Sequence, residues 1–282
     1  MIVLSFAYWY YGLIVISVVL LGASLSYRKN WRLLVLHLMV AGIIHPFEVV
    51  VMLTGGYYYI PGIVPDPQVD SLIGAFVSDL LIVPASAVAI NSFSLSWRFI
   101  LGIAAIFTGI DWLYVKAGVY VHFWWKSIYT GIGIIILYAI SMRLWLGLQE
   151  KQPSLVFRLL TIYLTYVPIP IVINFVVSRV FNVFKFEYLL FSALEKNHPV
   201  INTLHIILTG VALTLCFGLR LRFRYRLLGI ILLPSVNWAL GYYNIFVSPI
   251  GMSSQYLTLV SIIGMLFVIA LVHVAKLNYL FP

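Results

Sequence analysis

The chain has 282 residues, of which 63% are hydrophobic and 9% are charged. Ordinary soluble domains are about 25% charged, and 17 basic with 8 acidic side chains are too few to cover a globule of this length. The composition therefore excludes a water-soluble fold, a nucleic-acid-binding domain and a disordered chain. The single cysteine, Cys216, excludes a disulfide scaffold and a thiolate metal site. The surface must face lipid, so membrane lipids are the first expected partners.

Apolar runs recur along the chain, each close to the roughly 20 residues that a helix needs to cross the hydrocarbon core. The runs are continuous and do not alternate, which excludes a transmembrane β-barrel. The more polar stretch Phe181–Asn197 predicts an amphipathic helix in the membrane interface. The sequence thus predicts an all-α polytopic transmembrane helix bundle with one interfacial helix and nine spans, at 6–26, 33–54, 71–92, 98–115, 127–147, 158–178, 199–218, 227–247 and 256–276.

The connections between these spans are short, and no soluble domain is inserted. Residues 1–282 are therefore interpreted as a single integral membrane domain. No clear internal repeat is visible, although a polar connection divides the chain into candidate halves, 1–150 and 151–282. Motifs for ATP, dinucleotides and zinc proteases are missing, so the sequence predicts no cofactor.

Basic residues gather at alternate ends of the spans. Twelve of the 17 Lys and Arg residues follow the first, third, fifth, seventh and ninth spans, and five lie at the opposite ends. Because cationic side chains favour the cytoplasmic side, the sequence predicts an external N-terminus and a cytoplasmic C-terminus. The loop 54–70, with two aspartates and no basic residue, agrees. The expected location is the cell (inner or plasma) membrane, as a multi-pass protein.

Three acidic side chains fall inside predicted spans, where each costs about 2.5–3.5 kcal/mol on insertion scales and is a functional candidate. At about 1.5 Å per residue, Glu48, Asp79 and Asp111 lie roughly 9, 12 and 6 Å from the external ends of the second, third and fourth spans. We therefore expect them to meet in one outward-facing polar pocket in the outer half of the membrane. The alternative is that they hold helices together through hydrogen bonds.

Other polar and aromatic residues extend this predicted pocket. His45 shares a helical face with the acid three residues later. The external turn 111–129 is typical of an aromatic belt with snorkelling lysines, or of a pocket mouth in which Asp111 pairs with Lys116 or Lys126. Besides the three acids, the predicted pocket contains His45, His205, Asn174, Lys116, Trp124 and Trp125.

The pair His45 and Glu48 has a spacing at which imidazole and carboxylate can share a metal ion. No second His-x-x-Glu follows elsewhere in the chain, so the sequence predicts no metal. A buried carboxyl group that takes up and releases a proton is the favoured interpretation. No catalytic residue is assigned.

The segment Asp111–Tyr129 contains an acid–Trp pair followed by Lys-x-Gly-x-Tyr, a His and a Trp cluster. With Lys29–Arg32 after the first span and Pro84 late in the third, it resembles an uncharacterised family of small polytopic membrane proteins from endospore-forming Firmicutes. The likeness covers about the first 150 residues, and the last four spans have no counterpart in the family pattern. The resemblance implies a bacterial inner membrane and no activity, because none is established for the family.

Three classes of function remain open. The first is a carrier for a small solute or lipid, in which protonation of a buried acid would drive one step. The second is a membrane-embedded enzyme that acts on a lipid or isoprenoid substrate from the external leaflet, with the acids as general acid and base. The third is a non-catalytic membrane subunit or sensor with a membrane-protein partner. A cavity open at both ends would favour the carrier, a closed inner end with a lateral gap the enzyme, and no cavity the subunit.

Overall fold

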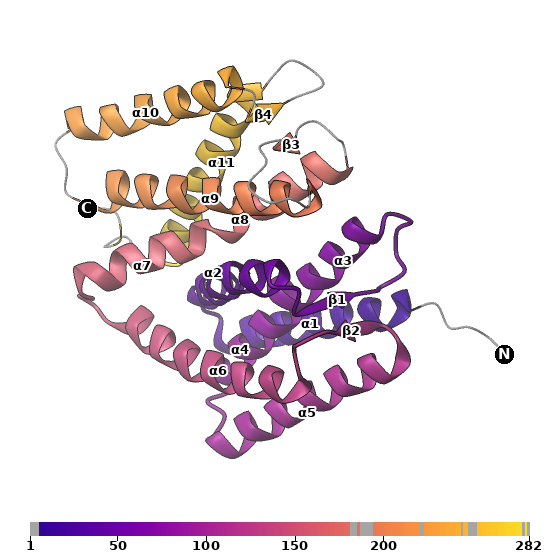
Figure 1. Ribbon diagram of the computed structural model, residues 1–282. Coiled ribbons are helices and arrows are strands. Elements are labelled where there is room, and N and C mark those ends of the chain that lie inside the picture. Colours follow the sequence, from indigo (N-terminus) through magenta and orange to yellow (C-terminus); the bar gives the residue numbers. More distant parts are fainter. Residues whose placement is uncertain are drawn as a thin grey trace. The chain divides into compact units, whose positions relative to one another are not determined.

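The computed structural model describes residues 6–180, 185–186, 194–219, 223–243, 245–247, 253–277 and 280. The chain forms two compact units, Met1–Lys151 and Gln152–Pro282. Each unit is a set of helices that carries a two-stranded antiparallel sheet (Figure 1).

Long apolar helices dominate the described part of the chain. The prediction of an all-α, multi-pass membrane protein is confirmed at this level. The predicted span 227–247 corresponds to α10 (Phe223–Tyr242), which lies outside the set that qualifies by length and hydropathy among the described residues, so the count of nine spans stays a prediction. Eight helical segments among the described residues are long and apolar enough to cross a membrane: Ala7–Arg28, Arg32–Leu53, Pro67–Ser92, Trp97–Ala117, Ser127–Gln149, Leu155–Arg179, Pro199–Gly218 and Gln255–Val274.

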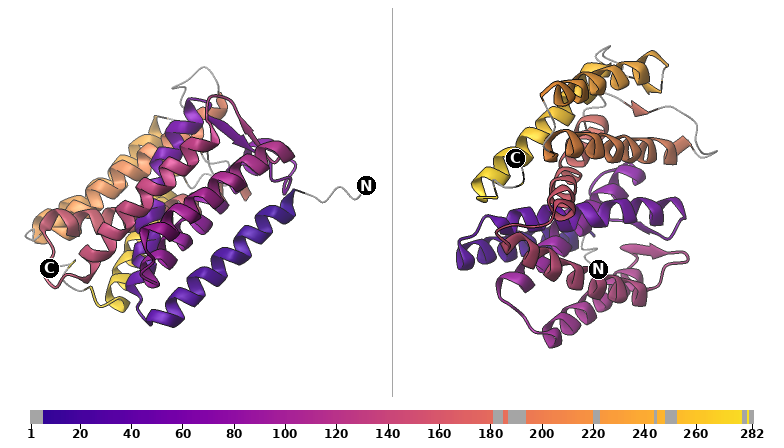
Figure 2. Two further views of the ribbon diagram at one scale, coloured as in Figure 1. Left: turned by 90° about the horizontal axis from the view of Figure 1, so that it is seen from below. Right: turned by 90° about the vertical axis from the view of Figure 1, so that its left-hand side faces the viewer.

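The first unit comprises α1 (Ala7–Arg28), α2 (Arg32–Leu53), β1 (Tyr57–Tyr59), α3 (Pro67–Phe76), the π-helix η1 (Val77–Ile82), α4 (Val83–Ser92), α5 (Trp97–Ala117), β2 (Tyr120–His122) and α6 (Ser127–Gln149). In this unit α1 packs along η1 and α4, α2 packs against α4 and α6, and α5 packs against α6. The left view of Figure 2 shows these helices, from indigo to magenta, running side by side.

The second unit comprises α7 (Leu155–Tyr166), α8 (Pro168–Phe175), the π-helix η2 (Val176–Val180), β3 (Lys185–Phe186), α9 (Leu194–Gly218), α10, β4 (Phe246–Val247) and α11 (Ser253–Val274). Here α9 packs against α7, and α10 packs against both α9 and α11. Most of the predicted interfacial helix, Phe181–Asn197, lies outside the described residues. Its described part consists of β3, which pairs with β4, and the beginning of α9, so its interfacial position stays a prediction.

The segment that forms the third span departs from regular α-helix at η1. Asp66 caps its start, because the carboxylate accepts hydrogen bonds from the backbone N–H groups of Gln68 and Val69 at 2.9 and 3.1 Å. The helix therefore begins four residues earlier than predicted. Short π-helical turns within α-helices are rare and frequently mark functional sites, and this one carries Asp79.

A histidine on the neighbouring helix stabilises this irregular segment. Pro84 has no N–H to donate to the carbonyl four residues earlier, that of Leu80. The Nε2 atom of His37, on α2, lies 2.8 Å from this carbonyl oxygen. Because a carbonyl only accepts, His37 donates from Nε2. This contact fixes η1 against α2 and so places Asp79 opposite the acid on that helix.

Candidate functional site

A small sheet connects the loop after α2 to the loop after α5. In the antiparallel pair, Tyr57 lies opposite His122 and Tyr59 lies opposite Tyr120. Because side chains alternate between the faces of a strand, Tyr57, Tyr59 and Tyr120 share one face. Their ring centroids lie 5.1 Å apart for Tyr57 and Tyr120 and 4.6 Å apart for Tyr59 and Tyr120. The sheet thus presents one continuous aromatic surface to the helices.

Backbone hydrogen bonds hold the sheet in place. The carbonyl of Gly56 accepts from the N–H groups of Phe123 and Trp125 at 2.9 and 3.2 Å. The carboxylate of Asp70, which is 5% exposed, accepts from three backbone N–H groups at 2.7, 2.7 and 3.1 Å, those of Gly62, Ile63 and Val64. Charge-assisted bonds of this kind are about twice as strong as neutral ones. Asp70 therefore stabilises the loop that carries β1.

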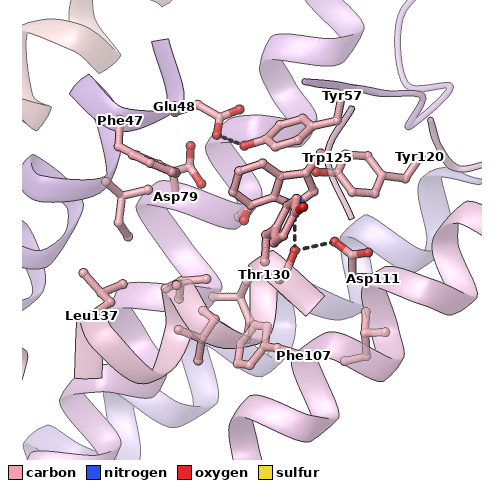
Figure 3. A pocket seen from close by; sticks show the side chains of 18 of the residues that line it. Phe47, Glu48, Tyr57, Asp79, Phe107, Asp111, Tyr120, Trp125, Thr130 and Leu137 are labelled. Atoms are coloured by element: carbon pink, nitrogen blue, oxygen red, sulfur yellow. Dashed lines mark hydrogen bonds between the residues drawn. The ribbon is translucent and has the colours of Figure 1, made fainter. Parts of the chain in front are cut away.

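A cavity of about 490 Å³ lies against the aromatic face of this sheet, within the first unit (Figure 3). Its volume falls in the range of roughly 300–1,000 Å³ that is usual for small-molecule sites. Most of its wall is aliphatic or aromatic, and three acids line it: Glu48, Asp79 and Asp111. The described lining contains no Lys, Arg or His. The cavity is therefore apolar, with polar groups of acidic character.

Glu48 is held by the sheet. It lies on α2, is 9% exposed, and accepts a hydrogen bond from the hydroxyl group of Tyr57. Burial raises the pKa of the Tyr57 hydroxyl well above its ordinary value, and the nearby Glu48 carboxylate adds to the shift. The hydroxyl group therefore stays protonated and acts as the donor. This bond orients the Glu48 carboxyl group within the cavity.

Asp79 lies next to Glu48. Figure 3 shows the two carboxyl groups side by side in one part of the cavity, close enough to interact electrostatically. Asp79 is 5% exposed, and its neighbour Ser78 hydrogen bonds to it. Two negative charges side by side in an apolar wall are costly. The pair is therefore suited to hold a proton or the cationic group of a ligand.

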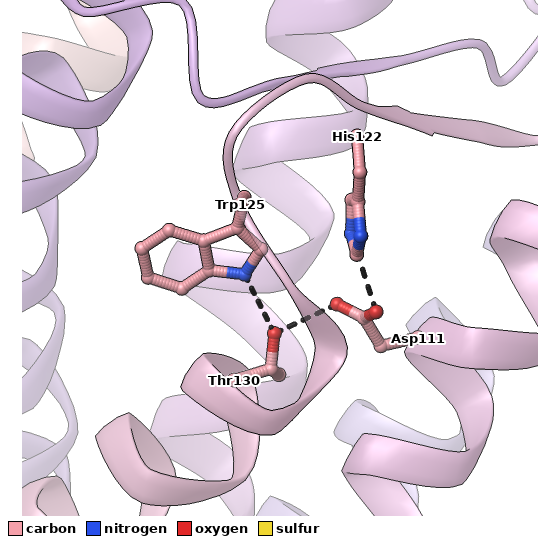
Figure 4. A network of polar contacts seen from close by, with 4 residues as sticks. All are labelled: Asp111, His122, Trp125 and Thr130. Carbon is pink, nitrogen blue, oxygen red and sulfur yellow. Dashed lines mark hydrogen bonds and ion pairs between the residues drawn. The ribbon is translucent and has the colours of Figure 1, made fainter.

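Asp111 belongs to a separate polar network at the edge of the cavity (Figure 4). The hydroxyl group of Thr130 donates to its Oδ2 atom at 2.7 Å, and the indole N–H of Trp125 donates to Thr130 at 2.9 Å. On the other side, Nε2 of His122 lies 3.2 Å from Oδ1 of Asp111. The network joins α5, α6 and β2, so Asp111 also has a structural role.

The prediction that Asp111 pairs with Lys116 or Lys126 is corrected by this network. His122 and Thr130 occupy both carboxylate oxygens. The ammonium group of Lys116 instead lies 5.8 Å from the centroid of the Trp112 ring, a cation–π distance. Lys116 follows Asp111 by five residues, a rotation of about 500° or roughly 140° beyond one full turn, so the two side chains leave α5 on different faces.

Of the other predicted pocket residues in the first unit, some line the cavity and others do not. Trp125 lines the cavity, whereas Trp124 is 46% exposed and donates from its indole N–H to the carbonyl of Thr54 at 3.0 Å. His45 is not among the lining residues.

His205 and Asn174 lie in the second unit and are not part of this cavity. Nε2 of His205 lies 2.8 Å from Oδ1 of Asn237, and the amide of Asn174 donates to Asn202 at 2.7 Å. Their shared depth in the sequence map could not show that they belong to a different unit. As for metals, no group of three or more His, Cys, Asp or Glu within the described ranges is arranged to hold an ion.

The cavity opens sideways. Among its lining residues, Phe47 on α2 is 55% exposed, and Ile132 and Ile136 on α6 are 49% and 56% exposed. Gly133, between the two isoleucines, also lines the cavity and is exposed. Exposed apolar side chains of membrane-spanning helices face lipid, so this opening leads to the lipid phase.

On the side of α4, the cavity borders a closely packed layer between α4 and α6. All ten residues of α4 are buried. The hydroxyl groups of Ser86 and Tyr138 lie 2.6 Å apart, and one turn further the amide of Asn91 donates to Ser141 at 3.0 Å. Buried polar groups with satisfied hydrogen bonds make such a layer rigid. The cavity therefore has exposed apolar residues on one side and a rigid polar layer beside it.

Two glycines in the cavity wall make a matched pair for mutagenesis. A Cβ atom at Gly74 would lie 2.6 Å from Cβ of Tyr59, whereas one at Gly133 has no atom within 4 Å. Because overpacking costs about 1–3 kcal/mol, Gly74→Ala should lower the free energy of unfolding by that amount. Gly133→Ala should leave it unchanged or raise it by about 0.5–1 kcal/mol through helix propensity. Denaturant unfolding in micelles compares them, and equal effects of both variants would contradict the described packing.

Sequence reasoning overlooked the tyrosines of the sheet and the partners of Asp111. The run Tyr57–Tyr59, which follows two glycines and is followed by Pro61 and Gly62, was an available signal, because aromatic residues favour strands. Strands of three residues are nevertheless too short for periodicity to reveal them. His122 and Thr130 carried no signal beyond their proximity in sequence to the aromatic turn.

Comparisons with protein-family models, with curated proteins and with solved structures found no match to this chain. The resemblance of its first half to an uncharacterised family of Firmicutes membrane proteins therefore stays a prediction. The function is inferred below from the cavity itself.

Proposed function

We propose that the first unit binds a lipid-like amphiphile that enters from one leaflet of the membrane. Such a ligand has an apolar chain and a head group that is cationic or rich in hydrogen-bond donors. The observation that carries this proposal is the joining of two features in one cavity: a lateral opening lined by Phe47, Ile132 and Ile136, and the carboxyl pair of Glu48 and Asp79.

The charge of the head group follows from the lining. The described lining has three acids and no basic side chain, so an anionic group there would meet like charges, which costs several kcal/mol at a desolvated interface. A primary ammonium group would instead donate hydrogen bonds, and the carboxylates of these acids would accept them. The acids therefore select for cations and donors, and the aliphatic wall accepts the chain.

The packed layer between α4 and α6 favours a process that takes place on one side of the membrane. A carrier that moves its ligand across the membrane needs access from both ends of the site, whereas Ser86, Tyr138, Asn91 and Ser141 form a hydrogen-bonded, buried layer next to the cavity. A site that receives a lipid from one leaflet needs only the lateral opening. Binding or presentation of such a ligand is therefore favoured over transport.

A membrane-embedded enzyme acting on the same class of ligand is the second candidate. The side-by-side carboxyl groups of Glu48 and Asp79 favour it, because such a pair can share a proton and serve as general acid and general base. The hydroxyl group of Tyr57, which burial keeps protonated, would orient Glu48. Conversion of the bound amphiphile, followed by mass spectrometry, separates this candidate from binding alone.

The proposal is tested with three ligands that share one alkyl chain: dodecylamine, dodecanol and dodecanoate. Binding to the purified full-length protein in nanodiscs is measured by calorimetry at neutral pH. We expect saturable binding in the order amine, alcohol, carboxylate, with at least about a tenfold difference in Kd between the first and the last, or roughly 1.4 kcal/mol. Equal affinities for amine and carboxylate, or no saturable binding of any of them, would overturn the proposal.

The distribution of basic residues supports a position of the sheet on the external side. The loop that carries Gly62 has two aspartates and no basic residue, whereas most basic residues follow alternate spans. A cysteine introduced at Gly62, with Cys216 replaced by alanine, should react with a membrane-impermeant maleimide added outside intact cells. Reaction only after the membrane is opened would place the sheet, and the cavity with it, on the cytoplasmic side.

A further inference from the structure

After α1, the second unit repeats the element order of the first. The series α2, β1, the α3–η1–α4 segment, α5, β2 and α6 corresponds in order to the α7–α8–η2 segment, β3, α9, α10, β4 and α11. The packing corresponds as well. α5 packs on α6 as α10 packs on α11, and α2 packs on α4 as α7 packs on α9. In both units a two-stranded sheet joins the same two loops.

The correspondence holds at one constant spacing along the chain. Element boundaries in the two units lie 126 residues apart at four places: the starts of α5 and α10 at Trp97 and Phe223, of β2 and β4 at Tyr120 and Phe246, of α6 and α11 at Ser127 and Ser253, and the ends of α4 and α9 at Ser92 and Gly218. Sequence identity at this spacing is sparse, but Arg32-Leu33-Leu34 recurs as Arg158-Leu159-Leu160, and Trp112 recurs as Trp238.

The same spacing relates the three cavity acids to polar residues of the second unit. Counting 126 residues from each acid gives these pairs: Glu48 with Asn174, Asp79 with His205, and Asp111 with Asn237. All three counterparts are buried. The other buried polar residues that the structure describes in the second unit are serines and threonines. Each buried amide or imidazole described there thus occupies the position of an acid in the first unit.

In the second unit two of these three residues contact each other, and the third, Asn174, donates to Asn202. Nε2 of His205 lies 2.8 Å from Oδ1 of Asn237, whose amide N–H donates to Thr258 of α11 at 2.9 Å. This bond joins α10 to α11, and the bond between Thr130 of α6 and Asp111 of α5 joins the equivalent pair of helices, although Thr130 itself corresponds to Tyr256. None of the three counterparts is a carboxylate, and each has a hydrogen-bond partner within the second unit without a ligand.

A buried tyrosine also changes places between the units. Tyr138 on α6 corresponds to Gly264 on α11, and Tyr166 on α7 corresponds to Val40 on α2. Both tyrosines are 0% exposed. A Cβ atom at Gly264 would lie 3.0 Å from the ring of Tyr166, so the ring occupies the space next to this glycine. In the first unit the buried tyrosine is on α6, whereas in the second unit it is on α7, which is the equivalent of α2.

We infer that the chain is an internal duplication of one four-helix unit, preceded by α1, and that Asn174, His205 and Asn237 are the neutral counterpart of the acidic site. In the second unit this polar set joins helices and binds no amphiphile. Because each repeat has an even number of helical segments, both repeats cross the membrane in the same direction. The inference does not depend on the proposed function, and its tests need no ligand.

The first test introduces an acid at Asn237, the counterpart of Asp111. In Asn237→Asp, the new carboxylate faces His205, and the hydroxyl group of Thr258 can turn to donate to it, as Thr130 donates to Asp111. We expect the melting temperature of the full-length protein in micelles to stay within about 4 °C of the wild type. The matched control is Val236→Asp, at an adjacent residue that is 47% exposed. It should yield little folded protein, because it places a carboxylate toward lipid.

An equal loss of folded protein in Asn237→Asp and Val236→Asp would overturn the inference. The second test compares sides of the membrane, in a chain with Cys216 replaced by alanine. Cysteines introduced singly at Gly62, after α2, and at Tyr243, after α10, should both be labelled from the same side, because the repeats are parallel. Labelling from opposite sides would also overturn the inference. Neither result bears on whether the first unit binds an amphiphile.

Discussion

Asp79→Leu should abolish high-affinity binding of dodecylamine without lowering the stability of the protein. The expected rise in Kd is about 30-fold or more, because removing one partner of a buried, hydrogen-bonded charge pair costs about 2–5 kcal/mol. The melting temperature should stay constant or rise, since Asp79 is 5% exposed beside Glu48 and an apolar residue of similar size relieves that repulsion. Calorimetry and thermal unfolding on the same preparations measure both effects.

This pair of readouts distinguishes a ligand site from polar contacts between helices. If Asp79 serves to join helices, Asp79→Leu lowers the melting temperature and leaves any amine binding in the surviving folded protein unchanged. Glu150→Gln is a matched control, because Glu150 is exposed at the end of α6 and lies outside the cavity lining. It should change neither affinity nor melting temperature.

Gly133→Trp should close the lateral opening and prevent binding of every amphiphile, whatever its head group. Gly133 lies between Ile132 and Ile136 in the exposed part of the cavity wall, and a Cβ atom there has no atom within 4 Å. The indole can therefore enter the cavity without displacing backbone, and loss of a helical glycine offsets part of the cost. We expect a rise in Kd of about 100-fold or more for dodecylamine and dodecanol alike, which corresponds to about 2.7 kcal/mol.

The control for this variant is Gly102→Trp. Gly102 lies on α5, is exposed, and also has no atom within 4 Å of a Cβ atom, but it is not part of the cavity lining. Its indole should face lipid and leave both affinities unchanged. Retention of wild-type affinity in Gly133→Trp would show that amphiphiles reach the protein by another route.

The sequence predicted the fold class and the burial of the acids because both follow from the cost of placing charge in hydrocarbon. That cost depends only on residue type and position along a span, so Glu48, Asp79 and Asp111 stood out without any structure. Side-chain partners depend on helix rotation and loop conformation. For this reason one interpretation of the sequence paired Asp111 with a lysine, whereas the structure places His122 and Thr130 there.

The extent of the site was less predictable. His205 and Asn174 have the same depth as the acids, but depth along the membrane normal carries no information about which unit a helix joins. The duplication was hidden for a related reason. At the spacing of 126 residues the acids are replaced by amides and an imidazole, so the chemical character changes while the buried positions stay the same.

The short sheet and η1 also escaped prediction, because neither leaves a periodic pattern. β1 and β2 have three residues each, and a π-helical turn differs from an α-helix in hydrogen bonding but scarcely in composition. Pro84 was recognised as a helix breaker. Its consequence, a carbonyl of Leu80 that contacts His37 on a neighbouring helix, requires the packing of α2 against η1 and so appears only in the structure.

The central claim is that an amphiphile occupies the cavity of the first unit, and fluorescence quenching by a brominated long-chain amine tests it most directly. Trp125 lines the cavity and is one of 8 tryptophans in the chain. Titration in nanodiscs should give a saturable component of quenching in the wild type that is absent from Trp125→Phe, above a non-saturable component common to both. A saturable component of equal size in both proteins, or none in either, would show that the cavity is not the binding site.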